Sequence, residues 1–208
     1  MTKHVRQLLS PEERQFVVDY ALSRPWSVDS WGRQTCDVPL FDTDILSWLY
    51  DKCFCVASSV FARTTIIPTY YKFCRYSPRY GAPRVPPHID ENACTYTVDI
   101  QLDSSTEWPI YIDFEEFKLT DGDAVLYMGE DQLHWRPPFP SDHGSEFVTM
   151  LFAHYAEPEH WFFKYGQNHI YDKDFHSEWI GKMKSLLSSA RHETMTELDE
   201  NVLFEFQN

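Results

Sequence analysis

Two histidines and one aspartate in this chain have the residue types and the spacing of a metal-ligand set. His88 and Asp90 form an H-x-D motif, and His134 follows Asp90 after 44 residues. Two imidazoles and one carboxylate are the ligands of non-haem Fe(II) sites, which keep coordination positions open for a co-substrate and dioxygen. A bare H-x-D motif is weak by itself, because the chain contains 9 histidines and 32 acidic residues. The alternative is that His88 and Asp90 are surface residues in loops.

The sequence around His88 favours an extended backbone, which would point the side chains of His88 and Asp90 in the same direction. Pro86 and Pro87 precede His88, and proline biases its surroundings toward extended conformations. Residues i and i+2 of a strand point to the same face. A third ligand must come from elsewhere, and a barrel that returns on itself supplies a strand roughly 40 to 60 residues later. His134 fills this role.

Short strands separated by turn residues are predicted on both sides of these ligands. We expect strands at 69–76, 95–102, 109–113, 123–128, 133–136 and 146–155, with residues 78–87 as a loop. In the second strand, an apolar face alternates with a polar one: Tyr96, Val98, Ile100 and Leu102 against Thr95, Thr97, Asp99 and Gln101. This pattern predicts a mainly β fold with flanking helices, in the form of a sandwich or barrel.

Helices are predicted at the two ends of the chain. Ser10 is a good N-cap for a helix over 11–23, with Pro11 in its first turn. Further helices are expected from about residue 43 to Phe61 and over 174–187. We expect one domain over 1–208, made of a helical N-terminal flank (1–67), a β core (68–157) and a helical C-terminal flank with a polar tail (158–208).

The composition of the chain limits the kinds of molecule that it is expected to bind. The net charge of −14 disfavours binding to nucleic acid or to an anionic membrane, although Lys72, Arg75, Arg79 and Arg84 cluster before the motif. No stretch has the ~20 apolar residues of a membrane span. Five cysteines without a zinc-binding spacing or a secretion signal indicate reduced thiols and a cytoplasmic location. The oligomeric state is left open.

The order of these residues resembles a known family. Arg75-Tyr76, Pro87-His88-Ile89-Asp90, Trp108-Pro109, Gly122-Asp123-Ala124, His134 and Gly144 together resemble the Fe(II)- and 2-oxoglutarate-dependent oxygenases, particularly their prolyl-4-hydroxylase-like branch. The resemblance spans about residues 69–156 and implies a double-stranded β-helix (jelly-roll, cupin-like) core. It also implies that His88, Asp90 and His134 are catalytic iron ligands, with Fe(2+), 2-oxoglutarate as co-substrate and O2.

The sequence departs from the family where the co-substrate is anchored. The family carries an Arg or Lys about ten residues after the distal histidine, whereas this chain has Ser145 and Glu146 there. A carboxylate cannot replace the basic residue, because it would repel the 2-oxoglutarate carboxylate. Arg136 is the best substitute, since it would point the same way as His134 on a continuing strand. The alternative is a surface arginine beside Trp135 or Pro137.

Further residues are candidates for binding the co-substrate. Tyr76 matches a position where the family places a tyrosine on 2-oxoglutarate, but it could equally be a packing residue. Arg75, with Lys72 and Arg84, is a reserve candidate for the anchor. His154 could bind the co-substrate or the substrate, or be a hydrogen-bonded core histidine. Trp108 and Trp135 are candidates for the wall of the site, although large aromatic residues in such a barrel are more often core residues.

The resemblance implies hydroxylation of an unactivated C–H bond. A carboxylate at Asp90 favours hydroxylation, since halogenating relatives have a small residue in that position. A compact acidic chain suits a small-molecule substrate such as an amino acid. The alternatives are a peptidyl (prolyl-type) hydroxylase and a non-catalytic cupin-like barrel that binds a ligand or metal. An Arg136 side chain that enters the barrel would favour the enzyme.

Overall fold

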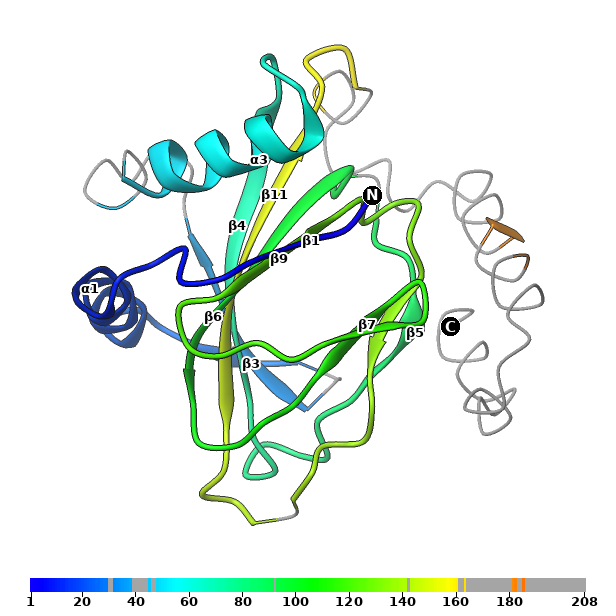
Figure 1. Ribbon diagram of the computed structural model, residues 1–208. Helices are drawn as coiled ribbons and strands as arrows, with labels where there is room; N and C mark the ends of the chain where they lie inside the picture. The colour runs from blue at the N-terminus through cyan, green and yellow to red at the C-terminus, as the bar shows by residue number, and fades with distance from the viewer. Residues whose placement is uncertain are drawn as a thin grey trace.

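The computed structural model describes residues 1–29, 32–38, 45, 48–91, 93–141, 143–160, 163, 181–182 and 185, which form two antiparallel β-sheets with flanking helices (Figure 1). The large sheet contains β1 (Lys3–Val5), β2 (Ser27–Val28), β3 (Arg33–Val38), β4 (Ile67–Tyr76), β6 (Tyr96–Ser104), β9 (Ala124–Tyr127) and β11 (Val148–Ala156). The small sheet contains β5 (Val85–His88), β7 (Ile110–Ile112), β8 (Glu115–Phe117) and β10 (His134–Arg136).

The path of the chain through the two sheets is that of a double-stranded β-helix. The strand order is β1-β9-β6-β11-β4-β3-β2 in the large sheet and β5-β10-β7-β8 in the small one. From β4 to β11 the chain passes repeatedly between the sheets, so that these eight strands form a jelly roll. The other three strands, β1 to β3, extend the large sheet at its two ends. The predicted fold class is confirmed.

All six predicted strands are present, with ends displaced by at most two residues, as β4, β6, β7, β9, β10 and β11. Three features differ from the prediction. Residues 85–88, inside the expected loop, form β5, which tolerates Pro86 and Pro87 because it is the edge strand of the small sheet. The N-terminal flank is not purely helical, because it contributes β1, β2 and β3, and the short β8 was also not predicted.

The first helix begins where its capping residues predict. Helix α1 spans Pro11–Leu22, and Ser10 and Glu13 close a capping box at its start. A π-helical turn, η1 (Tyr50–Phe54), leads into α3 (Cys55–Phe61), which matches the end of the second predicted helix. The start of that helix, and most of the helix predicted over 174–187, lie outside the described residues. No described helix has the length and apolar character that crossing a membrane requires.

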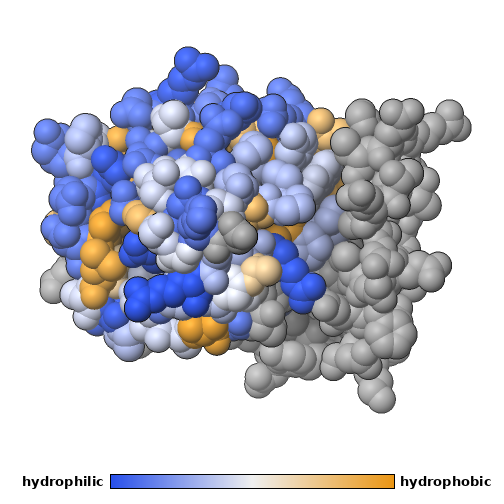
Figure 2. Space-filling model, turned by 90° about the horizontal axis from the view of Figure 1, so that it is seen from below, coloured by the Kyte–Doolittle hydropathy of each residue, from blue (hydrophilic) through white to orange (hydrophobic). Residues whose placement is uncertain are grey.

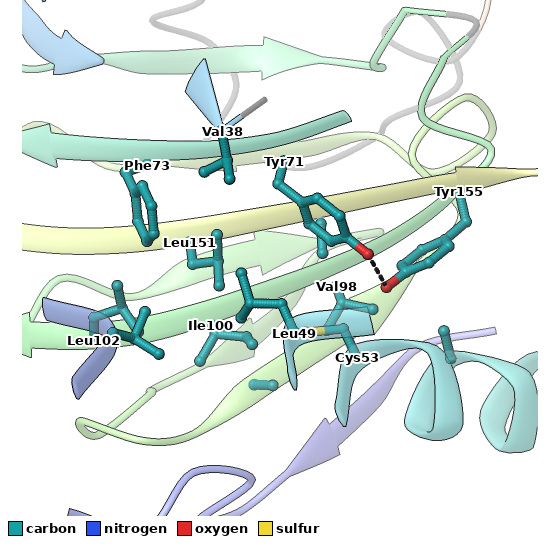
Figure 3. Packing of buried hydrophobic residues seen from close by; sticks show 14 of the residues in the cluster. Val38, Leu49, Cys53, Tyr71, Phe73, Val98, Ile100, Leu102, Leu151 and Tyr155 are labelled. Atoms are coloured by element: carbon teal, nitrogen blue, oxygen red, sulfur yellow. Dashed lines mark hydrogen bonds between the residues drawn. The ribbon is translucent and has the colours of Figure 1, made fainter. Parts of the chain in front are cut away.

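The large sheet buries an apolar surface on the side that faces α1 and α3. Tyr71 and Phe73 of β4, Leu151 of β11, and Val98 and Ile100 of β6 pack there against helix residues (Figure 3). The Tyr71 and Tyr155 hydroxyls lie 3.2 Å apart and form a hydrogen bond within this core. We call this apolar side of the large sheet the helix-side face.

The opposite side of the large sheet packs against the small sheet, and we call it the inner face. A second apolar cluster lies between the sheets and includes Cys74, Tyr76, Trp108, Tyr127 and Met150. The outer surface in the view of Figure 2 is mainly hydrophilic, with small, separate apolar patches. All five cysteines are free thiols, as predicted; the expected cytoplasmic location stays a prediction.

Candidate metal centre

The three predicted metal ligands meet in the structure. Nε2 of His88 lies 3.6 Å from Oδ1 of Asp90, and Nε2 of His134 lies 3.4 Å from the same oxygen. The two imidazole rings have their centroids 4.3 Å apart. One potential ligand atom from each residue lies within 4.8 Å of the other two. The fold therefore brings the H-x-D motif and the distant histidine into one cluster.

Pairing between two strands of the small sheet explains how residues so far apart in the sequence become neighbours. β5 and β10 are antiparallel partners, and His134 lies directly opposite His88 in their register. Asp90 follows two residues after the end of β5. Strand β10 is therefore the returning strand that we expected to supply the third residue of the cluster.

Backbone carbonyls orient both imidazoles. Nδ1 of His88 lies 2.7 Å from the carbonyl oxygen of Pro86, and Nδ1 of His134 lies 3.0 Å from that of Gln132. When Nδ1 carries the proton and donates it to the carbonyl, Nε2 keeps its lone pair. Both Nε2 atoms then face Asp90 as donors to a cation.

A glycine makes room for the carboxylate. The Asp90 amide donates a hydrogen bond of 2.8 Å to the carbonyl oxygen of Gly129. A Cβ atom added at Gly129 would lie 2.5 Å from Oδ2 of Asp90 and 2.5 Å from the carbonyl oxygen of Cys94, which is too close for any side chain. We infer that position 129 must be glycine for Asp90 to take this position.

Electrostatics within the cluster suit a bound cation. Burial and the neighbouring His134 lower the pKa of His88 to about 3. Burial opposes ionisation of Asp90, but the two histidines outweigh it and hold the pKa of Asp90 below its ordinary value. Burial likewise opposes protonation of His134, but Asp90 outweighs it and raises the pKa of His134. Two imidazole nitrogens and one carboxylate, with His134 buried and His88 and Asp90 partly exposed, are a donor set that fits Fe(II).

Arg136 enters the space between the sheets, as its position two residues after His134 predicts. Its exposed fraction is 5%, so it is not a surface residue. The guanidinium lies 4.9 Å from the centroid of the Trp108 ring, donates to the Trp108 carbonyl oxygen, and has Nη2 3.5 Å from Sδ of Met150. Among the described residues it has no ion-pair partner. A buried cation without a counter-ion is suited to binding an anion.

Tyr76 lies beside Arg136, against the same tryptophan. The Tyr76 and Trp108 rings meet edge to face with centroids 4.9 Å apart, and burial raises the pKa of Tyr76 to about 12. Nη1 of Arg33 donates to the Tyr76 hydroxyl at 3.3 Å. Arg33 was not predicted, because no motif marks it; only its pairing opposite Tyr76 between β3 and β4 brings it here.

Arg75 does not join this cluster. On β4 the neighbouring Cys74 and Tyr76 belong to the inner face, so Arg75 points to the other side of the sheet. Its guanidinium lies 3.9 Å from the centroid of the Phe147 ring. Trp135 of the small sheet also points away from the space between the sheets, since it alternates with the buried His134 and Arg136 and stacks on Tyr111 with ring centroids 5.3 Å apart.

The missing basic residue has a structural counterpart. Ser145 and Glu146 precede β11, which starts at Val148, so neither lies on the strand. The β11 residue that contacts Arg136 is Met150, which carries no charge. Arg136 on β10 therefore supplies the positive charge that β11 lacks.

His154 lies on the inner face, next to the metal cluster. Its Nδ1 is 3.1 Å from Oγ1 of Thr97, and its ring centroid is 4.5 Å from that of Tyr70. The Tyr70 hydroxyl lies 3.2 Å from Sγ of Cys94. His154 is thus a buried, hydrogen-bonded histidine that lies close to Asp90. Its binding to the co-substrate or the substrate stays a prediction.

Asp99 is a buried acid that the sequence indicated only as part of a polar strand face. Burial and the neighbouring Asp90 raise the pKa of Asp99 to about 7. The Tyr127 hydroxyl donates to Oδ2 of Asp99 at 3.1 Å, whereas Oδ1 has no hydrogen-bond partner among the described residues. Such a group costs stability unless a bound molecule satisfies it.

No model of a known protein family matches the sequence, and no curated protein matches it significantly. Solved structures do match. A 2OG-Fe(II) oxygenase family protein from Burkholderia pseudomallei has a TM-score of 0.60 at 12% identity, covering 74% of this chain and 85% of its own. HygX from Streptomyces hygroscopicus, solved with nickel, 2-oxoglutarate and hygromycin B, has a TM-score of 0.60 at 9% identity, covering 76% and 83%.

A prolyl hydroxylase is among the matching structures. The viral collagen prolyl hydroxylase of Paramecium Bursaria Chlorella virus-1, in its 2-oxoglutarate complex, has a TM-score of 0.57 at 12% identity and covers 74% of this chain and 94% of its own. Identities this low show the fold alone. The chain has the fold of the Fe(II)- and 2-oxoglutarate-dependent oxygenases.

Proposed function

We propose that this protein is an Fe(II)- and 2-oxoglutarate-dependent dioxygenase that hydroxylates an unactivated C–H bond. The observation that carries the proposal is the convergence of two Nε2 atoms on one carboxylate oxygen, at 3.4 and 3.6 Å, inside a fold shared with such oxygenases. An inward Arg136 also favours an enzyme over a non-catalytic barrel, since a barrel that merely held a metal would not need a buried guanidinium that has no ion-pair partner among the described residues.

His88, Asp90 and His134 would hold the iron. Bound Fe(II) supplies the activation of dioxygen that no side chain can provide. The chain's own contribution is positioning: the Pro86 and Gln132 carbonyls fix the two imidazoles. The three residues leave other coordination positions open, which a purely structural site does not need.

Arg136 and Tyr76 would bind the far carboxylate of 2-oxoglutarate. The guanidinium can form two parallel hydrogen bonds to a carboxylate, and the Tyr76 hydroxyl can add a third. Trp108, which contacts both side chains, holds them on one side of the space between the sheets. Burial strengthens this pairing, because little water competes for the carboxylate.

We further propose a small-molecule substrate, such as an amino acid. The acidic chain, at −14, gives no general attraction for nucleic acid. HygX was solved with a small molecule bound, which supports this class by analogy. The alternative, a peptidyl hydroxylase, has the viral collagen prolyl hydroxylase as its analogue. Comparing free amino acids with peptides of the same residues, by mass spectrometry, separates the two.

The co-substrate assignment is tested by comparing two arginine variants. Arg136→Ala should raise the 2-oxoglutarate concentration needed for succinate formation by on the order of 100-fold, because a buried charge pair is lost. Iron binding should change little. The matched control is Arg75→Ala, which removes an arginine that faces away from the site and should leave this concentration unchanged. Equal behaviour of the two variants would remove Arg136 as the anchor.

A further inference from the structure

A second group of metal-binding side chains lies beside the first and shares one residue with it. Asp90, Cys94 and His154 each offer a ligand atom, and these atoms lie within 4.8 Å of one another. Cys94 and His154 have exposed fractions of 1% and 5%. We propose that this cluster binds a second divalent cation, Zn²⁺ in preference to Fe²⁺, and that Asp90 bridges the two sites.

The carboxylate of Asp90 is placed to bridge. Its Oδ1 faces the imidazoles of His88 and His134, at 3.6 and 3.4 Å. Its Oδ2 lies on the side of Gly129, where an added Cβ atom would be 2.5 Å from Oδ2, 2.5 Å from the Cys94 carbonyl oxygen and 2.7 Å from Oγ1 of Thr97. The two oxygens of one carboxylate therefore have different surroundings, and Oδ2 lies beside Gly129, as the Cys94 carbonyl oxygen does.

Neighbouring side chains orient the other two ligands. Thr97 holds the His154 ring through Nδ1 at 3.1 Å, and Tyr70 packs on the same ring. The Tyr70 hydroxyl lies 3.2 Å from the Cys94 sulfur. Metal-binding histidines and cysteines are held in this way by outer hydrogen bonds, which fix the ring and the sulfur before the ion arrives.

The ligand types select the ion. A thiolate, an imidazole and a carboxylate together suit Zn²⁺, which accepts sulfur, nitrogen and oxygen ligands in tetrahedral sites. The His88, Asp90 and His134 set contains no sulfur and suits Fe²⁺. On binding, the Cys94 S–H bond breaks, its proton passes to the buffer, and a sulfur–metal bond forms without any change in oxidation state.

Sharing Asp90 couples the two sites. Each cation draws on the same carboxylate, and the two positive charges repel each other across a short distance. We therefore expect the two ions to bind with different affinities, and each ion to weaken the binding of the other by the same factor.

Cobalt(II) distinguishes the two sites, because a cobalt–thiolate bond gives strong near-ultraviolet absorption and cobalt bound to histidine and carboxylate does not. The full-length protein is freed of metal and titrated with Co²⁺ without oxygen, and bound cobalt is measured by elemental analysis. We expect two equivalents to bind, only one of which produces the thiolate absorption. One equivalent of Zn²⁺ should then remove that absorption.

Variants assign the absorption to its ligands. Cys94→Ser and His154→Gln should each lose one equivalent of cobalt together with the thiolate absorption, and circular dichroism confirms that both are folded. His88→Ala should lose the other equivalent and keep the absorption. The matched control is Cys74→Ser, a buried thiol on the inner face of β4 that should retain both equivalents.

Several results would overturn the second site. One equivalent of cobalt without thiolate absorption in the unmodified protein would mean that only the first site exists. Absorption that persists in Cys94→Ser would place the thiolate elsewhere, for instance at the exposed Cys55. Loss of the absorption in His88→Ala would mean that there is a single mixed site. If no cobalt binds at all, the second site and the proposed iron site both fail.

Discussion

The two faces of strand β6 differ in what they bury. On the helix-side face, Tyr96, Val98, Ile100 and Leu102 pack into an apolar core. On the inner face, Thr97, Asp99 and Gln101 are buried just as deeply, with exposed fractions of 0%, 3% and 2%. An alternating strand usually places its polar side chains in water. Here they point instead toward the space that contains the candidate metal centre.

The two faces of the large sheet therefore contribute to different properties, one to the stability of the fold and the other to the chemistry of the site. The helix-side face stabilises the fold through apolar burial and close packing. The inner face buries polar groups, and one of them, Oδ1 of Asp99, has no hydrogen-bond partner among the described residues. Proteins tolerate such groups mainly where a ligand or a reaction requires them. We therefore expect changes on the two faces to affect different measurements.

The largest effect is expected at the metal centre. His134→Ala removes one of three ligands and should abolish iron binding and turnover, while circular dichroism shows that the metal-free protein is still folded. Metal content after dialysis, together with 2-oxoglutarate consumption, checks this. Full activity in the variant would show that His134 is not a ligand.

On the helix-side face, a truncation should affect stability alone. Phe73 is fully buried there, and Phe73→Ala should lower the free energy of unfolding by about 3 to 5 kcal/mol. The affinity of the remaining folded protein for iron should be unchanged. Denaturant titration and metal binding are measured on the same sample. A large loss of metal affinity with little loss of stability would contradict the separation of the two faces.

Asp99 should make the stability of the metal-free protein depend on pH. Its pKa is raised by burial and by Asp90 to about 7, from an ordinary value of 3.8. Between these values the folded state binds more protons than the unfolded state, so the free energy of unfolding falls as pH rises from about 4 to 7. The fall should be on the order of 3 kcal/mol.

Asp99→Asn isolates this contribution, since it removes the titrating group at nearly constant shape. Denaturant titrations of both proteins at pH 4.5 and 7.5, or about those values, give the difference. The variant should lose most of the pH dependence in this range. The same slope in both proteins would mean that Asp99 is not the titrating group.

The smallest effect is expected for a polar contact on the helix-side face. The Tyr71 and Tyr155 hydroxyls are 3.2 Å apart, and Tyr71→Phe removes this hydrogen bond while keeping the ring. We expect a loss of about 1 kcal/mol in the free energy of unfolding, with iron binding unchanged. A loss of stability as large as that of Phe73→Ala would show that the hydroxyl pair contributes more to the free energy of unfolding than one hydrogen bond should.

Much of the fold could be predicted because its signals are local. Alternation of apolar and polar residues predicted β6, and Ser10 with Pro11 predicted the start of α1. Strands β1 and β2 could not be predicted, since segments of three and two residues carry too little pattern. Residues 85–87 were predicted as part of the loop over 78–87, and the place of β5 at the edge of the small sheet explains how a strand with two prolines forms there.

The candidate site could be predicted where the spacing of residues along a strand determines which way their side chains point. The interval of two residues placed His88 with Asp90, and His134 with Arg136, as the structure has them. The same rule applied to β4 separates Arg75 from Tyr76 and places Arg75 on the side of the sheet that faces away from the candidate site. Arg33 and Cys94 could not have been found, because their positions depend on pairing and loop contacts between distant segments.

Anaerobic absorption spectroscopy tests whether iron and 2-oxoglutarate bind together in the space between the two sheets. The Fe(II)-loaded protein is titrated with 2-oxoglutarate without oxygen and scanned in the visible range. We predict a weak metal-to-ligand charge-transfer band that saturates with 2-oxoglutarate and is missing in His88→Ala. Bound iron that gives no such band at saturating 2-oxoglutarate would contradict the account.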